Sequence, residues 1–174
     1  MDAPIAFRQQ LLGAIPRLRR YARSLVFDAS AADDLVQTAL ERALAHWHQF
    51  DQRRDILVWT VSIAHNAYMD DRRRHARTPW FDADPEAALA QAQAATSDPG
   101  LRIDLLSALK RLPAEQREPI LLVAVEQLSY AECAEVLRIP VGTVMSRISR
   151  GRVALRALLE GRPAPAAHGL RRVV

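Results

Sequence analysis

The chain has 174 residues and a formal net charge of +4, and 49% of its residues are hydrophobic but only 6% aromatic. No stretch approaches the roughly 20 apolar residues of a membrane span, and the N-terminus lacks the order of a secretory signal. A lone cysteine, Cys133, excludes an internal disulfide, so we expect a soluble cytoplasmic protein. Scarce glycine and abundant alanine, leucine and arginine favour an all-α fold.

Residues 1–77 predict a bundle of three amphipathic helices. Pro16 should kink or split the first helix, Ser30 can cap the second and Asp55 the third. The apolar positions at helical spacing are Leu11, Ile15, Leu18, Ala22 and Leu25, then Val36, Leu40, Ala43 and Trp47, then Ile56, Trp59, Ile63 and Ala67. We interpret Trp59 as a core residue.

Residues 78–100 are acidic, rich in alanine and glutamine and bounded by prolines, which indicates a flexible linker. Residues 101–160 predict four helices, with Pro119 near a first turn or a bend. Ser129 and Glu132 fit a capping box for a short helix that ends near Leu137. A three-residue turn follows, and Pro140 suits the first position of the last helix, as in a helix-turn-helix. Residues 161–174 predict a disordered basic tail.

The last helix carries the residues that suggest DNA binding. Its core stripe is expected to be Val144, Ile148, Leu155 and Leu158, with polar side chains projecting away from it. Hydroxyls and guanidinium groups on such a face can bind phosphates and base edges in the major groove. An ordinary arginine-rich surface helix is the alternative. The candidate DNA contacts on this helix are Gly142, Thr143, Met145, Ser146, Arg147, Arg150 and Arg152.

The stretch from Leu112-Pro113 through Leu128–Glu132 and Ile139–Val144 to Arg152 resembles region 4 of extracytoplasmic-function (ECF) sigma factors. The stretch Asp33–Gln37, then Phe50-Asp51, then Trp59 to Arg73 resembles region 2 of the same family. Together these motifs cover nearly the whole chain. The resemblance implies a sigma factor that gives core RNA polymerase promoter specificity, under the control of an anti-sigma factor, with no enzymatic activity.

The resemblance also assigns roles to residues: it implies that the candidate DNA contacts of the last helix bind the −35 promoter element and that residues of the first half bind the −10 element. A polymerase-docking element, for the β′ clamp, would comprise Asp33, Asp34, Leu35 and Gln37, with Leu35 and Gln37 exposed, and region 4 would contact the β flap. Asp33 and Asp34 can equally be helix caps. The −10 contacts, including a pocket for an unstacked base, would be Phe50, Asp51, Arg53, Arg54, Asn66, Arg72, Arg73, Arg74 and Arg77. One of these arginines is expected to pair with Asp70 or Asp71 instead.

Other residues do not suggest chemistry. His46 and His48 point to different helix faces and cannot easily share a metal, and Cys133 is interpreted as a core residue. No metal site or cofactor is expected. Two alternative functions stay open: a polymerase-independent helix-turn-helix regulator, and a non-transcribing decoy that titrates an anti-sigma factor.

Overall fold

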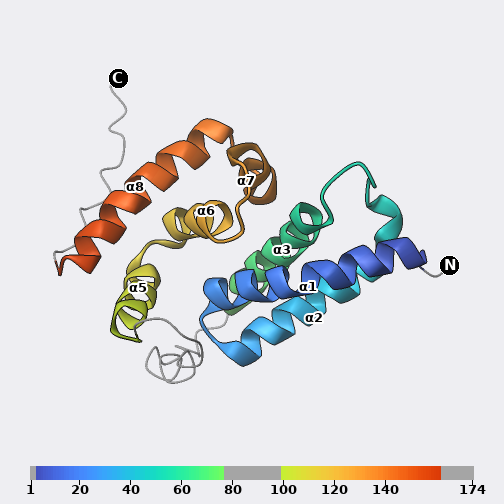
Figure 1. Ribbon diagram of the computed structural model, residues 1–174, viewed down its shortest axis with the longest axis horizontal. Helices are drawn as coiled ribbons and strands as arrows, with labels where there is room; N and C mark the ends of the chain where they lie inside the picture. The colour runs from blue at the N-terminus through green and yellow to red at the C-terminus, as the bar shows by residue number, and fades with distance from the viewer. Residues whose placement is uncertain (1–2, 77–98, 162–174) are drawn as a thin grey trace.

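The computed structural model describes residues 3–76 and 99–161, and this part of the chain is entirely helical, as predicted. The first half holds α1 (Ile5–Val26), α2 (Ala29–Ala45), a 3-10 turn η1 (Trp47–Gln49) and α3 (Ile56–Ala76). The second half holds α5 (Pro99–Arg111), α6 (Ala114–Ala124), α7 (Tyr130–Leu137) and α8 (Val141–Leu159), as Figure 1 shows. The predicted linker, except Pro99 and Gly100, and residues 162–174 of the predicted tail lie outside the described residues.

Helix caps explain where several of these helices begin, and they correct one prediction. Asp28, not Ser30, caps α2: its carboxylate accepts a hydrogen bond from the Ala31 amide at 2.7 Å. The carboxylate of Asp55 accepts from the Leu57 amide at 2.7 Å, as predicted for the start of α3. The capping box of Ser129 and Glu132 at α7 is also confirmed.

Pro16, Pro119 and Pro140 occupy helix positions that differ from the predicted ones. α1 runs unbroken past Pro16, so the helix is not split. Pro119 lies in the second turn of α6, where it is buried. Pro140 is the residue before α8, not its first residue, and the helix begins at Val141.

The first half is a three-helix bundle with a main core and a smaller aromatic cluster at one end. In that cluster Trp59 packs against Phe7 and Phe50, with ring centroids 6.0 and 5.2 Å apart. Trp59 is therefore part of the core, as predicted. Burial of these large rings stabilises the end of the bundle that carries the loop from Phe50 to Asp55.

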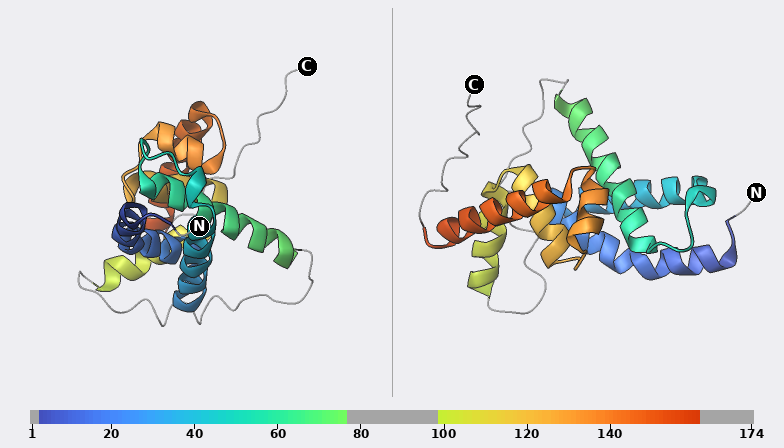
Figure 2. Two further views of the ribbon diagram at one scale, coloured as in Figure 1. Left: turned by 90° about the vertical axis from the view of Figure 1, so that its right-hand side faces the viewer. Right: turned by 90° about the horizontal axis from the view of Figure 1, so that it is seen from above.

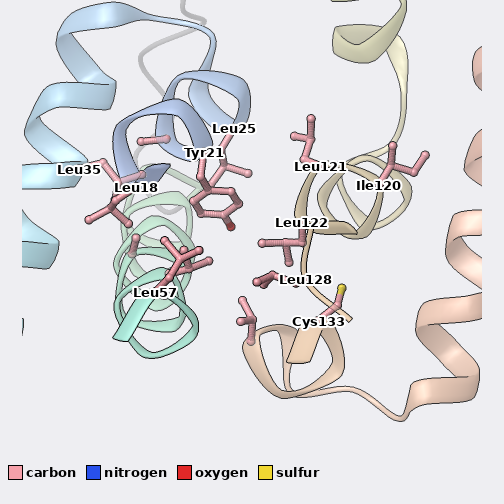
Figure 3. Packing of buried hydrophobic residues seen from close by; sticks show 14 of the residues in the cluster. Leu18, Tyr21, Leu25, Leu35, Leu57, Ile120, Leu121, Leu122, Leu128 and Cys133 are labelled. Atoms are coloured by element: carbon pink, nitrogen blue, oxygen red, sulfur yellow. The ribbon is translucent and has the colours of Figure 1, made fainter. Parts of the chain in front are cut away.

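The two halves pack against each other and share one hydrophobic core, which the sequence analysis did not anticipate. Tyr21 and Leu25 of α1 face Leu122 of α6 and Leu128 of the following loop (Figure 3). Both views of Figure 2 place the second half directly against the first. The chain is thus a closed pair of helical units, with residues from both halves in a single core.

Polar and cation–π contacts reinforce the interface between the halves. The Glu126 side chain is fully buried, and its carboxylate accepts hydrogen bonds from Nε and Nη2 of Arg20 at 2.9 and 3.0 Å. Arg17 of the same helix also pairs with this carboxylate, at 3.4 Å, and donates to the Glu126 carbonyl. The ring of Phe27 lies 5.3 Å from Lys110 Nζ and 5.0 Å from the Arg117 guanidinium.

Candidate nucleic-acid interface

The helix-turn-helix is formed by α7, the turn Arg138–Pro140 and α8. Arg138 ends α7 in the left-handed conformation (φ 54°), and its amide and that of Ile139 are bonded to carbonyls of α7. This compensates for the cost of a positive φ at a non-glycine residue. The turn directs the chain into α8, whose N-terminal half then lies at the surface of the molecule (Figure 1).

α8 is held against α6 by a close contact at Gly151. A Cβ atom at Gly151 would lie 2.6 Å from Ile120 Cδ1 and 3.2 Å from the Gln116 carbonyl oxygen. The buried face of α8 comprises Val144, Ile148, Gly151, Ala154 and Leu158. The predicted stripe is thus confirmed except that Leu155 is only partly buried. The packing fixes which side of α8 points outward.

The outward side of α8 carries most of the predicted −35 residues. Gly142, Ser146, Arg150 and Arg152 are exposed, and so is Met145, with 52% of its surface accessible. Thr143 is half-buried. The side chain of Arg147 is 26% exposed, and its guanidinium lies 3.6 Å from the Glu115 carboxylate of α6. One helix therefore brings all seven residues together, with Arg147 partly covered.

Two of these polar side chains are bonded along the helix itself. Arg150 Nε donates to the Ser146 carbonyl at 3.3 Å, and Ser146 Oγ donates to the Thr143 carbonyl at 3.0 Å. Such bonds are exposed and weak, so a ligand that offers a phosphate or a base edge can replace them.

The predicted −10 residues are divided by the structure. Phe50 is 8% exposed and belongs to the aromatic cluster, so its ring is covered in this arrangement, and its contact with the −10 element stays a prediction. Its ring gains more from packing on Phe7 and Trp59 than from contact with solvent. Asp51 and Arg53 are exposed in the turn that follows, and Asn66 is half-buried on α3.

Arg54 connects the first half to the helix-turn-helix. It is exposed, but its guanidinium pairs with the carboxylate of Glu135 on α7. A residue predicted to contact the −10 DNA is thus engaged by the second half in this arrangement. No sequence pattern indicated this pairing, since 81 positions separate the two residues.

The arginines at the end of α3 are exposed but partly neutralised. Arg73 lies 3.9 Å from Asp70, and Arg74 lies 3.5 Å from Asp71. The Arg72 guanidinium lies 5.7 Å from the centre of the Tyr68 ring. The prediction that one arginine pairs with Asp70 or Asp71 is confirmed, and two of them do so. Arg77 lies outside the described residues.

The predicted polymerase-docking residues on α2 are exposed with one exception. Asp33 pairs with Arg19 of α1 at 3.0 Å, Gln37 donates to Glu41 at 2.9 Å, and Asp34 is exposed. Leu35 is 9% exposed and belongs to the shared core, so its predicted exposure is wrong. Its position one turn before Ala39 places it on the buried stripe of the helix.

A surface groove between α1 and α2 was missed by the sequence analysis. Its volume is about 480 Å³, and its rim includes Leu12 and Leu44, which are 64% and 44% exposed. Both leucines lie outside the apolar stripes identified from the sequence. Apolar residues outside those stripes could have indicated an exposed apolar groove.

Burial shifts the pKa of three ionisable groups near the interface, His65, Glu118 and Cys133. Desolvation, with the nearby charge of Arg138, lowers the pKa of His65 to about 4, so its imidazole is neutral at neutral pH. Its Nδ1 lies 3.6 Å from the Glu118 carboxylate, whose pKa burial raises. Burial also raises the pKa of Cys133 to about 12, which agrees with its assignment to the core.

The described residues contain no group of three or more His, Cys, Asp or Glu side chains arranged to hold a metal ion. Among the described helices none is both long enough and apolar enough to cross a membrane.

The family models and relatives agree with this geometry. Residues 102–155 match the family model of Sigma-70 region 4, and residues 11–65 match that of the Sigma2 domain of PhyR. The chain is 37% identical over 159 residues to the ECF RNA polymerase sigma factor EcfG of Rhodopseudomonas palustris, covering 88% of this chain and 85% of EcfG. The chain belongs to the ECF sigma factors.

Further comparisons support this ECF assignment. SigW of Bacillus subtilis is 34% identical over 140 residues, covering 74% of this chain and 75% of SigW. The sigma factor RpoE of Bartonella quintana, solved in complex with the anti-sigma factor NepR, is 32% identical. Its structure matches with a TM-score of 0.75 over 89% of this chain and 97% of RpoE. The relatives are sigma factors, which are not enzymes.

Proposed function

We propose that this ECF sigma factor binds core RNA polymerase through α2 and contacts two promoter segments, one with each half. The N-terminal half of α8 would bind the −35 element as duplex. The turn after Phe50 and the end of α3 would bind the −10 element and assist its opening. The observation that carries the proposal is the exposed edge of α8, with Arg150 and Arg152, in the segment that matches region 4.

The closed arrangement of the halves adds a requirement to this proposal. The −10 and −35 elements are about 25 base pairs apart, which corresponds to roughly 85 Å of B-form DNA. A compact body of the size of the described part of this chain, about 140 residues, has a radius of gyration of only roughly 14 Å. We therefore infer that the halves separate when the protein engages polymerase and promoter, which would release Arg54 from Glu135.

Residues 77–98 supply enough chain for that separation. Twenty-two residues between α3 and α5 can span at most about 3.5 Å each, or roughly 80 Å. The interface between the halves is the element that must open.

Transcription reconstituted with core polymerase tests the proposal. Core enzyme plus this chain should initiate at a cognate promoter, selected from a library of random promoter sequences, and core enzyme alone should not. Arg150→Ala should weaken −35 discrimination. Arg156→Ala, which removes an exposed arginine two turns further along the same helix, is the matched control and should not.

A second variant separates the two promoter contacts. Asn66→Ala should spare −35 discrimination and slow strand opening, measured by permanganate reactivity of unpaired thymines. Equal loss of both steps would contradict the division of labour between the halves. Failure of the chain to co-purify with core polymerase would refute the proposal as a whole.

We further propose that an anti-sigma protein regulates this chain. Among similar solved structures, the sigma factor RpoE is bound to the anti-sigma factor NepR, and CnrH is bound to the cytosolic domain of CnrY. CnrH is 29% identical and matches with a TM-score of 0.68. An anti-sigma protein of the NepR type, added to the transcription assay, should suppress initiation.

One observation favours a second function, that of a decoy which binds an anti-sigma protein without supporting transcription. The first half matches the Sigma2 domain of PhyR, and the anti-anti-sigma factor PhyR shares the fold at 18% identity. A decoy would co-purify with an anti-sigma protein but would not initiate transcription with core polymerase at any promoter. The transcription assay therefore distinguishes the two functions.

A further inference from the structure

α8 exposes two apolar side chains on the part of its surface that we propose to face DNA. Val141 is 43% exposed and Met145 is 52% exposed. They are four residues apart, so they lie one turn apart on the same side of the helix. Together they form an apolar edge, which we call the Val141–Met145 edge.

The fold itself does not account for this edge. The core of the second half takes its contacts from the opposite face of α8, beginning with Val144 and Ile148. Val141 and Met145 are not among the buried or partly buried residues of either hydrophobic cluster. Exposure of two neighbouring apolar side chains near the start of a recognition helix therefore indicates a partner surface.

The polar side chains of the same region are less available than their number suggests. Arg147 is partly covered and paired with Glu115, and Arg150 is bonded to the Ser146 carbonyl. Gly142 offers no side chain. Hydrogen-bond readout by Arg147 or Arg150 would first have to replace these contacts, whereas the apolar edge needs no rearrangement to make contact.

In the major groove, one feature of the base edges is apolar: the C5-methyl group of thymine. We propose that the Val141–Met145 edge reads thymine methyl groups in the −35 element. The inference rests on the proposed function, because it requires α8 to enter the groove. It goes beyond that function by assigning the chemical class of base that the helix selects and by adding Val141 to the specificity-determining residues.

The distance between Val141 and Met145 along the helix limits how far apart the contacted thymines can be. Four residues of α-helix advance about 6 Å, close to two base-pair steps of 3.4 Å. A helix that follows the groove would therefore contact methyl groups about two steps apart. We expect one or two methyl-sensitive positions within the −35 element, and no more.

Replacing thymine by deoxyuridine tests this directly, since it removes the methyl group and keeps every hydrogen-bonding group of the base. The −35 sequence is first obtained by selecting active promoters from a randomised library with the reconstituted holoenzyme. Each thymine of that element, on either strand, is then replaced singly. At one or two positions the rate of open-complex formation should fall about two- to fourfold, the effect of one buried methyl group.

Variants of the edge identify the residue responsible. Met145→Ala and Val141→Ala should each reduce the difference between thymine and deoxyuridine at one position. Val153→Ala is the matched control: Val153 is an apolar residue of the same helix, 59% exposed, but it lies about two turns beyond Met145. That variant should retain the full difference. All three side chains are exposed, and circular dichroism checks that each variant is folded.

The outcomes separate this inference from the proposed function. If the holoenzyme initiates nowhere, the proposed function fails. If it initiates but no −35 thymine is sensitive to its methyl group, or the selected element contains no thymine on either strand, only the methyl readout is overturned. Methyl sensitivity that persists unchanged in both Met145→Ala and Val141→Ala also overturns it.

Discussion

Glu126 provides the sharpest test of the closed arrangement, because its carboxylate lies in the interface between the halves and is completely buried. The change to make is Glu126→Gln, which keeps the size of the side chain and removes its charge. We expect the variant to remain helical but to spend more time with its halves apart. The interface would lose its charged acceptor for Arg17 and Arg20.

The magnitude follows from the contacts. A hydrogen bond to a charged group contributes about 1.5–3 kcal/mol, and Arg20 alone makes two with this carboxylate. Because the side chains of Arg17 and Arg20 are 41% and 53% exposed, water replaces part of what they lose. A net loss of about 2 kcal/mol corresponds to a roughly 30-fold shift toward separated halves.

Removing the two arginines and keeping Glu126 should separate the halves more than Glu126→Gln does. In the double variant Arg17→Ala/Arg20→Ala the Glu126 carboxylate stays buried without a positive partner. Leaving a buried charge uncompensated costs about 3–5 kcal/mol. Separation of the halves hydrates the carboxylate, so this variant should open more than Glu126→Gln.

Pulsed electron paramagnetic resonance between nitroxide labels measures the separation. Gln10→Cys on α1 and Arg156→Cys on α8 are exposed attachment sites, and buried Cys133 should stay unlabelled. Arg19→Ala is the matched control, since it removes an α1 arginine whose partner, Asp33, lies within the same half. Equal distance distributions in Glu126→Gln, the double arginine variant and Arg19→Ala would refute the reasoning.

Three further predictions concern individual packing and titration features. Gly151→Ala should destabilise the second half by about 1–3 kcal/mol, because its Cβ would clash with Ile120, whereas Gly142→Ala, which meets nothing within 4 Å, should not lower the thermal midpoint. The free energy of unfolding should fall as pH drops from about 6.5 toward about 4, because the pKa of His65 is depressed in the folded state and the unfolded chain binds the proton first. The raised pKa of Glu118 acts in the opposite direction. The decisive measurement is therefore urea titration at each pH, in which the His65→Gln variant should show a smaller fall in the free energy of unfolding. Cys133, with its pKa raised to about 12, should not react with a disulfide reagent at pH 8 until denaturant is added, and fast reaction of the folded protein would contradict its burial.

Local features were predictable where short-range interactions decide them. The capping box at Ser129 depends on two residues three positions apart, and the cap at Asp55 on a carboxylate beside the helix start. The helix-turn-helix was predictable for the same reason, since its turn and its apolar stripe depend on residues that are close together in the sequence. The predicted cap of α2 was wrong because Asp28 and Ser30 are two positions apart and both side chains can accept a hydrogen bond from an amide; the helix begins at Ala29, so Asp28 is the cap and Ser30 lies inside the helix.

Local sequence patterns were enough to predict an all-helical chain with two helical halves, and the family to which it belongs. They did not predict that the halves share a core or that Arg54 pairs with Glu135, because these contacts join residues more than 80 positions apart. The burial of Leu35 and Phe50 likewise follows from how the helices pack, since Phe50 is covered by Phe7 and Trp59. Helical periodicity identifies the apolar face of each helix but not its partner, so pairing between halves is a property of the folded molecule.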